Sequence, residues 1–209
     1  ADAKILSGCW AHAMAPAQQK HVLPQARGFV GGRQLVQNAV DIDSAARTAG
    51  WRAPLRRALL LLFDFAAAFP SVAQRFLLAV LAAIGVPQGF LEFVTSLYRI
   101  NRAVRAWDGT VLFHVLAGIM QGCPLSGLLF TLVANQFFLH ICSIIDAANK
   151  RISRICADDL CTLLWDRDWL ALLVAPFRLA KRLANLSLKS AKTLAVPCDA
   201  GWSSEAETD

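Results

Sequence analysis

The sequence lacks the residue patterns that build a metal–thiolate centre or a disulfide framework. Its six cysteines include no C-x-x-C pair, and its four histidines do not cluster with them. Zinc sites and small disulfide-rich folds depend on such spacings. The sequence therefore indicates neither, and we expect free thiols in a reducing compartment.

Charged residues are also scarce, at 17% of the chain against 56% apolar residues, and the mean hydropathy is +0.45. One apolar stretch, residues 128–145, is long enough to raise the question of a membrane span. It carries Asn135, Gln136 and His140 near its middle, where polar side chains are costly in lipid. We therefore expect a helix buried against a sheet, and no membrane contact.

Acidic residues are few until the end of the chain. All 21 lysines and arginines lie at or before Lys192, whereas four of the 15 acidic residues follow residue 198. Residues 1–198 thus carry 21 basic against 11 acidic residues, a formal charge of +10. A basic body is compatible with a polyanionic partner such as nucleic acid. We expect the acidic tail, residues 198–209, to be disordered.

The chain shows no secretory signal, and it begins without Met. The missing initiator suggests a piece of a longer protein. Its length suits one domain with a sizeable core, or one domain and part of another.

Two adjacent carboxylates, Asp158 and Asp159, stand between the apolar runs 152–156 and 160–165. This pattern predicts a tight β-hairpin with the pair at its tip. Neighbouring like charges raise each other's pKa, so a cation or solvent has to compensate them. The pair by itself leaves two interpretations open, a metal site and a solvated turn.

A further carboxylate follows the apolar run 58–63, which is typical of a strand buried on both faces, although a buried helix of that length stays open. The run ends at Asp64. A charge in that place is costly unless it has a partner or lies at a ligand site beyond the strand. The alternative is an ordinary helix N-cap.

Two glycine-rich loops precede helices. Residues 25–34 combine three glycines with Arg27 and Arg33, which suits phosphate binding but also suits a solvated loop. Residues 118–127 combine three glycines with Pro124. Such a turn would let a flat base or sugar lie on the backbone, or it merely starts the long helix.

The remaining periodicity indicates an α+β or mixed α/β fold with a sheet of about four strands. It predicts a helix over residues 4–14 that loosens at Pro16. The Asp108-Gly109 pair predicts a basic hairpin joining residues 103–107 and 111–115. Further helices are expected over residues 71–84, 89–99 and 169–186, with a strand region over 187–196.

Taken together and in this order, these motifs resemble the palm and part of the fingers of a reverse transcriptase, most like those of non-LTR retrotransposons. Asp64, followed by Ala68 and Phe69, resembles the first catalytic motif. Residues 121–126 read Q-G-C-P-L-S and are similar to the family's Q-G-x-P-L-S signature, and residues 156–159 resemble its aromatic-Ala-Asp-Asp box. The other similar segments are the fingers-like residues 4–7 and 25–33 and the Lys-Thr segment 186–193.

The resemblance implies a polymerase palm over residues 58–197, that is, a small and mainly antiparallel sheet packed on helices. It implies a partial fingers region over residues 1–57 and no thumb. The expected activity is that of an RNA-directed DNA polymerase, using two ions of Mg²⁺ or Mn²⁺. The expected partners are an RNA template, a DNA primer and deoxynucleoside triphosphates. The oligomeric state stays open, and the expected location is intracellular, the nucleus included.

The resemblance also assigns residue roles. The expected metal ligands and catalytic carboxylates are Asp64, Asp158 and Asp159, with Lys192 acting on the departing pyrophosphate. The nucleotide would meet Arg33, Phe69, Gln121 and Gly122, and Phe69 would exclude a 2′ hydroxyl. The template and primer would meet Pro124, Leu125, Ser126 and Cys156.

Several positions depart from the family pattern. Cys156 stands where an aromatic residue is usual, and residues 11–14 read A-H-A-M where Asn-Arg-Leu is expected. Gly127 replaces a frequent Pro and Pro70 a frequent Asp. We recognise no primer grip, thumb or endonuclease. A truncated or decayed palm that binds nucleic acid without turnover is therefore the alternative.

Overall fold

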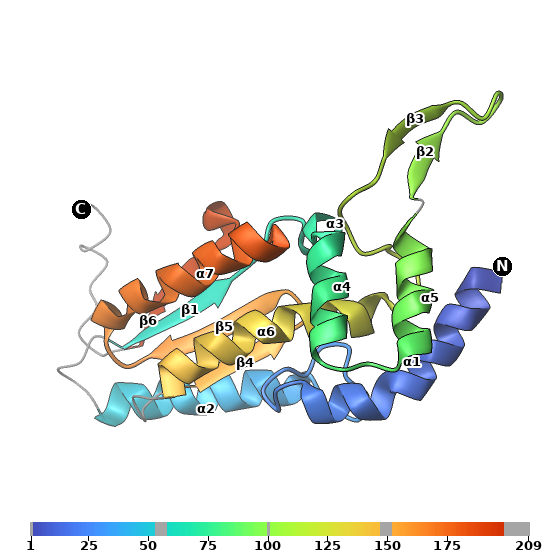
Figure 1. Ribbon diagram of the computed structural model, residues 1–209. Helices are drawn as coiled ribbons and strands as arrows, with labels where there is room; N and C mark the ends of the chain where they lie inside the picture. The colour runs from blue at the N-terminus through green and yellow to red at the C-terminus, as the bar shows by residue number, and fades with distance from the viewer. Residues whose placement is uncertain (1, 53–57, 100, 147–151, 199–209) are drawn as a thin grey trace.

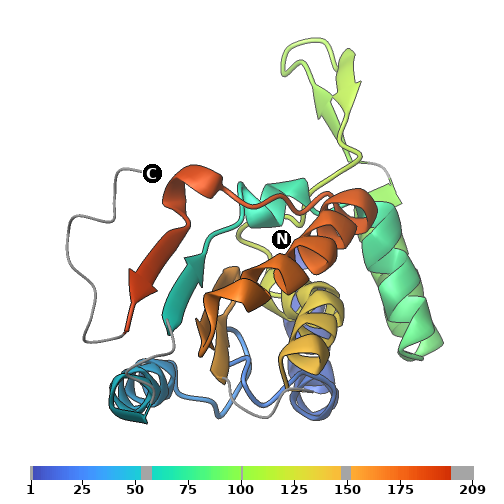
Figure 2. The same ribbon diagram turned by 90° about the vertical axis from the view of Figure 1, so that its left-hand side faces the viewer.

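A four-stranded sheet with the strand order β4-β5-β1-β6 lies at the centre of the fold, and every neighbouring pair is antiparallel (Figures 1 and 2). The computed structural model describes residues 2–52, 58–99, 101–146 and 152–198. The strands of this sheet are β1 Leu59–Phe63, β4 Ile152–Cys156, β5 Asp159–Leu164 and β6 Leu194–Pro197. The predicted small antiparallel sheet is thereby confirmed.

Helices cover both faces of the sheet. They are α1 Asp2–His21, α2 Val36–Arg52, α3 Ala68–Ser71, α4 Gln74–Ala83, α5 Gln88–Arg99, α6 Ser126–Asp146 and α7 Leu170–Ala184, with 3₁₀ turns η1 Arg167–Trp169 and η2 Ser190–Lys192. Side chains alternate along a strand. Leu160 and Leu164 therefore enter the main core with α6 and α7, while Leu163 packs with α2.

The prediction that β1 is buried on both faces was wrong for one of them. Leu61 and Phe63 are buried in the main core, but Leu62 is 37% exposed. On that second face Leu60 packs with the α2 cluster, whereas Leu62 lines a cavity farther along the strand. An apolar run in the sequence does not indicate how far along the strand a helix packs against it.

Helix α1 runs through Pro16 instead of loosening there. A proline inside a helix removes one hydrogen bond and crowds the preceding turn, so the next turn needs other support. Gln18 supplies it, because its buried amide donates to the Thr131 hydroxyl at 2.6 Å and to the Phe29 carbonyl at 3.0 Å. Tertiary contacts thus outweigh the local penalty.

The helix predicted over residues 71–84 begins only at Gln74 of α4, and a separate short helix, α3, ends at Ser71. Val72 and Ala73 are extended between them, with ψ of 121° and 116°. Their backbones bond elsewhere, since Gly118 N–H donates to Val72 O at 2.7 Å and Ala73 N–H donates to Ala184 O at 2.9 Å. Long-range partners therefore replace the helical bonds that the sequence pattern favours.

Helix α6 is long and apolar enough to cross a membrane, yet 72% of its most apolar window is buried inside the fold. The expectation of a buried helix is confirmed. Asn135, near its middle, has no exposed surface. Its side-chain oxygen accepts from Leu23 N–H at 2.9 Å, and its side-chain nitrogen donates to His21 O at 3.2 Å. Asn135 thus holds the end of α1 and the segment that follows it against α6.

The predicted hairpin is present as β2 Arg102–Val104 and β3 Val111–His114, and it projects from the body of the fold (Figures 1 and 2). Its strands are shorter than expected because the pairing shifts between Ala103 and Val104. In the 187–196 region, only β6 and an isolated bridge at Leu188 are strand-like. The acidic tail beyond Cys198, predicted to be disordered, lies outside the described residues.

One carboxylate on α2 joins three segments. The Asp41 carboxylate accepts from Gln37 at 2.9 Å, from Arg27 at 2.8 Å and from Arg154 of β4 at 2.7 Å. These hydrogen bonds, that of Gln37 first, hold the pKa of Asp41 well below its usual range. The ionised form of Asp41 therefore links α2, the 25–34 loop and the sheet.

We expect Asn135→Leu to lower the free energy of unfolding by about 1–3 kcal/mol, because it leaves two backbone groups without their partner. Urea titration followed by circular dichroism would measure the loss. The matched control is Gln136→Leu, since Gln136 donates only to Leu132 O of its own helix. Equal stability of the two variants would contradict the fastening role of Asn135.

We expect Asp41→Asn to lower the melting temperature by several degrees at pH 7. A carboxyl whose pKa is lower in the folded state stabilises the protein above the unfolded pKa, near 4, and this contribution disappears as the pH falls through the folded pKa. The difference between wild type and variant should therefore shrink in strong acid.

The control for this change is Asp43→Asn on the same helix, whose ion pair with Arg47 is largely exposed. Exposed pairs contribute little, so this variant should melt like the wild type at every pH. A wild-type melting temperature for Asp41→Asn at pH 7 would contradict the role given to Asp41.

Candidate active site

Strand pairing brings Asp64 to a pair of carboxylates, Asp158 and Asp159, that lies far from it in the sequence. In the antiparallel register Phe63 of β1 faces Leu160 of β5, so that Asp64, one residue beyond β1, reaches the start of β5. Asp159 begins β5, and Asp158 lies in the turn between β4 and β5. Asp64 and Asp158 are 94 positions apart in the chain. The hairpin predicted around Asp158 and Asp159 is confirmed by the pairing of β4 with β5.

The carboxylates repel one another. Burial, followed by the charges of Asp158 and Asp64, raises the pKa of Asp159, and Lys192 opposes that rise. The Lys192 ammonium lies 3.4 Å from a carboxylate oxygen of Asp64. Burial and then the two neighbouring aspartates also raise the pKa of the Cys156 thiol. The site thus concentrates negative charge, with one lysine against it.

A cavity of about 310 Å³ adjoins these charges. Asp64, Asp159, Cys156 and Lys192 line it together with Arg154 and residues of α2. Asp158 does not line this cavity. The described residues contain no group of three His, Cys, Asp or Glu side chains already gathered as a metal site.

The fingers-like loop packs directly on the hairpin turn. Arg27 N–H donates to Ile155 O at 2.9 Å, and Ile155 N–H donates to Gln25 O at 3.1 Å. A Cβ atom on Gly28 would lie 2.3 Å from the Ala157 backbone nitrogen, so only glycine fits. The glycine that suggested a ligand contact in the sequence therefore gives the hairpin turn at Ala157 the room to pack against the loop.

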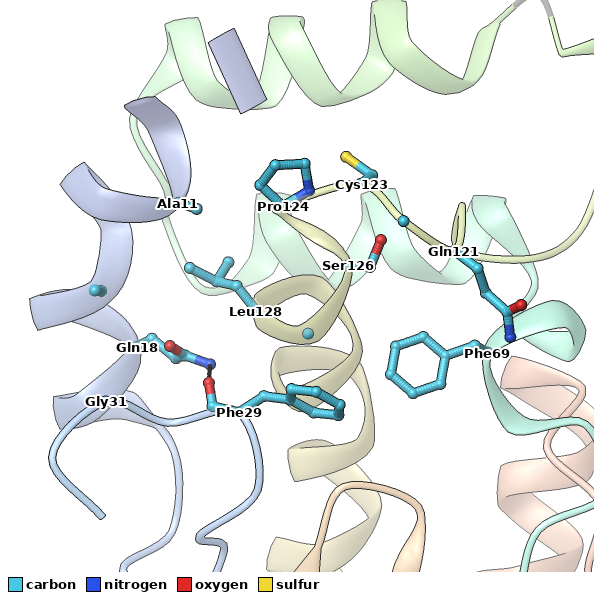
Figure 3. Close-up of a pocket in the computed structure, with 13 residues that line it drawn as sticks. Ala11, Gln18, Phe29, Gly31, Phe69, Gln121, Cys123, Pro124, Ser126 and Leu128 are labelled. Atoms are coloured by element: carbon cyan, nitrogen blue, oxygen red, sulfur yellow. Dashed lines mark hydrogen bonds between the residues drawn. The ribbon is translucent and has the colours of Figure 1, made fainter. Parts of the chain in front are cut away.

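A second cavity, of about 540 Å³, is lined by Phe69, Gln121, Gly122, Pro124 and Ser126 (Figure 3). Sequence reasoning grouped these residues around a nucleotide and its template, and the fold does bring them together. Residues of α1 and of the fingers-like loop also line the pocket, and the sequence motifs did not predict them. These are Ala11, Ala15, Gln18, Phe29 and Gly31.

Phe69 is held by two other rings. It stacks on Phe130 with ring centroids 4.3 Å apart, and it meets the edge of Phe29 at 5.7 Å (Figure 3). Phe29 itself has a left-handed φ of 57°. A Cβ atom on Gly127 would lie 2.8 Å from the Phe29 ring, so the glycine that replaces the family's proline makes room for Phe29.

Three residues predicted to bind substrates are also engaged within the fold. Leu125 has no exposed surface, and its template contact stays a prediction. The Ser126 hydroxyl donates to Met120 O and closes the turn before α6. The Arg33 guanidinium donates to four backbone carbonyls, at 2.5–3.0 Å, and burial lowers its pKa. Its triphosphate contact stays a prediction. The four carbonyls belong to Gln19, Val22, Leu23 and Ala26.

Residues outside the motifs complete the site. Asn38 of α2 lines the smaller cavity and donates to Ile155 O at 3.0 Å, and Gln18 holds the loop that carries Phe29. The one signal for Gln18 in the sequence is its position, a polar residue on an apolar helical face. This position indicates a buried hydrogen bond but not the partner.

Known proteins resemble this chain in sequence and in fold. In sequence, it is 29% identical over 126 residues to the Pol polyprotein of the R2DM retrotransposable element of Drosophila melanogaster, a match that covers 59% of the chain and 12% of that protein.

In fold, apo telomerase from Candida tropicalis gives a TM-score of 0.65 at 13% identity over 97% of the chain. Telomerase from Candida albicans, solved with a fragment of telomeric RNA, gives 0.60 at 11% identity over 93% of the chain. The chain spans 37% and 34% of these two structures.

A family model described as reverse transcriptase (RNA-dependent DNA polymerase) matches residues 1–200, nearly the whole chain. The match includes the three carboxylates at the strand ends and the residues that line the two cavities. This chain belongs to the reverse transcriptase family.

Proposed function

We propose that this chain is an RNA-directed DNA polymerase domain that adds deoxynucleotides to the 3′ end of a DNA primer on an RNA template. The observation that carries the proposal is the meeting of Asp64, Asp158 and Asp159 at the strand ends, in a fold that also gathers Phe69 and Gln121 in one pocket. Membership of the family supports the class of reaction.

The chemistry of the three carboxylates suits divalent cations. They are hard oxygen donors, as Mg²⁺ and Mn²⁺ prefer, and their mutual repulsion is what a bound cation would relieve. When bound, two ions would activate the primer hydroxyl and stabilise the leaving pyrophosphate. Asp64 and Asp158 would hold both ions, with Asp159 in support.

The other residues would position the substrates. Lys192, which already faces Asp64, would neutralise or protonate the departing pyrophosphate. Gln121 and Gly122 would lie against the nascent pair, and Pro124 against the template. Cys156 would stand near the primer terminus. Residues 1–57 would then act as the fingers part and 58–197 as the palm.

Phe69 would set the preference for deoxynucleotides. Its ring is fixed between Phe130 and Phe29, so it could not move aside for a 2′ hydroxyl. A rigid ring beneath the sugar would therefore favour deoxyribose over ribose.

Loss of a carboxylate should abolish incorporation. We expect Asp158→Asn to reduce primer extension on an RNA template with Mg²⁺ or Mn²⁺ by about a hundredfold or more, since charge stabilisation by a metal contributes several kcal/mol. The control is Asp168→Asn, which removes an exposed acid from η1. It should leave extension unchanged.

Extension that persists in Asp158→Asn would contradict the assignment of the carboxylates. No extension by the wild-type chain, with either metal and at low salt, would contradict the polymerase proposal. Binding without extension would then favour the alternative, a palm that holds nucleic acid without turnover.

The sugar preference can be tested separately. We expect Phe69→Ala to lower the ratio of deoxynucleotide to ribonucleotide incorporation by about tenfold or more. Phe76→Ala is the matched control, because Phe76 stacks on Phe137 outside the pocket. It removes the same ring and should keep the wild-type ratio. An unchanged ratio in Phe69→Ala would show that the ring does not select the sugar.

A further inference from the structure

A basic groove of about 700 Å³ lies between α4, α5, α7 and the segment that follows β3. Four cations from three helices line it: Arg75 of α4, Arg99 of α5, and Lys181 and Arg182 of α7. All four are exposed. The rest of the lining is uncharged and consists of Ala73, Gln74, Leu78, Thr95, Tyr98, Leu116, Ala117, Leu183 and Asn185.

These cations have no anionic partner in the part of the chain that the structure describes. No acidic side chain lines the groove, and none of the four takes part in an ion pair there. The nearby hairpin adds Arg102, which is exposed and likewise without an ion pair. The result is a surface of concentrated positive charge, which attracts anions.

Helix stability does not account for the whole group. Lys181 and Arg182 lie in the last turn of α7, where cations interact favourably with the helix dipole. Arg75, however, lies in the first turn of α4, where the dipole repels a cation. Its position costs stability, and a ligand in the groove would offset that cost.

The basic groove is distinct from the cavity of about 540 Å³ that contains Phe69 and Gln121, which we call the catalytic pocket. The two cavities share no lining residue, and the chain from Phe69 to Ala73 runs between them, with Phe69 in one and Ala73 in the other. Backbone bonds fix this divider on both sides. Ile119 N–H donates to Phe69 O at 2.8 Å, and Ala73 N–H donates to Ala184 O at 2.9 Å.

We propose that the basic groove binds the phosphate backbone of an RNA segment that lies outside the catalytic pocket. Guanidinium groups grip phosphate oxygens in two places and a lysine adds a point charge, so the set suits repeated phosphates spread over several nucleotides. Such contacts hold RNA without reading its sequence. The ligand class rests on the proposed function, in which RNA is the template.

The test measures binding alone, so that it can be read whether or not the chain extends a primer. Fluorescence anisotropy follows two RNAs annealed to the same labelled DNA primer. One RNA has about 12 nucleotides and ends with the primer, and the other has about 40 and offers further phosphates beyond it. The groove variant is Arg99→Ala with Arg182→Ala.

The matched control is Arg47→Ala with Arg167→Ala, which removes two exposed arginines from α2 and η1. Arg167 lies before the start of α7, and α7 alone separates it from Arg182 by about 18 Å, at 1.5 Å per residue from Leu170. Both double variants have the same net charge, so a general electrostatic effect would weaken both equally. Circular dichroism should show wild-type folding in each.

For the long RNA, the groove variant should bind about tenfold more weakly, and the slope of log K against log salt should fall by about two. Its affinity for the short RNA should stay within about twofold of the wild type. The control variant should match the wild type on both. A third variant, Arg99→Lys with Arg182→Lys, should retain most of the binding because it keeps the charges.

Three outcomes would overturn the proposal. Equal weakening on both RNAs would assign the cations to the primer–template path of the catalytic pocket. No weakening on the long RNA would exclude a phosphate contact. Competition by polyglutamate as strong as that by unlabelled RNA would make the groove a general site for acidic chains. Failure of primer extension alone would contradict the proposed function and leave this result standing.

Discussion

The repulsion between three carboxylates is the constraint on which the rest of this structure depends. Pairing of β1 with β5 brings Asp64 to Asp158 and Asp159, and burial, followed by the charges that meet there, raises the pKa of Asp159. The unfavourable free energy of holding like charges together has to be offset by favourable contacts elsewhere in the fold. Lys192 offsets part of it, and the core beneath the sheet, from Leu160 and Leu164 to α6 and α7, holds the strands in register.

Polar groups help to fasten the first third of the chain to this centre, in addition to its buried apolar side chains. Asn135 binds the segment after α1, Arg33 gathers four carbonyls of that segment and of the loop beside it, and Asp41 links α2 to the sheet. Hydrogen bonds are directional, so such contacts fix orientation as well as distance. They bring Phe29 to Phe69. The pocket that contains Phe69 and Gln121 is therefore built jointly by the amino-terminal segment, by Phe69 and by residues 121–128.

Charge is arranged by region in this molecule. Three aspartates meet at the strand ends, whereas the rest of the described body carries most of the positive charge, including the basic groove behind the divider 69–73. A cluster of carboxylates suits cations, and a basic surface suits phosphates. The same polyanionic substrate would thus be attracted at long range and positioned at short range by opposite charges.

The sequence by itself determined the hairpin with Asp158 and Asp159, the strand before Asp64, the buried α6 and the reverse transcriptase family, because these depend on local patterns and ordered motifs. It could not determine that Pro16 lies inside a helix, that Leu62 is exposed, that Leu125 is buried, or that Arg33 binds backbone carbonyls. Each of these depends on a partner distant in the chain. Periodicity records which face of an element is apolar, but only the tertiary structure decides what covers that face and which groups remain free for a ligand.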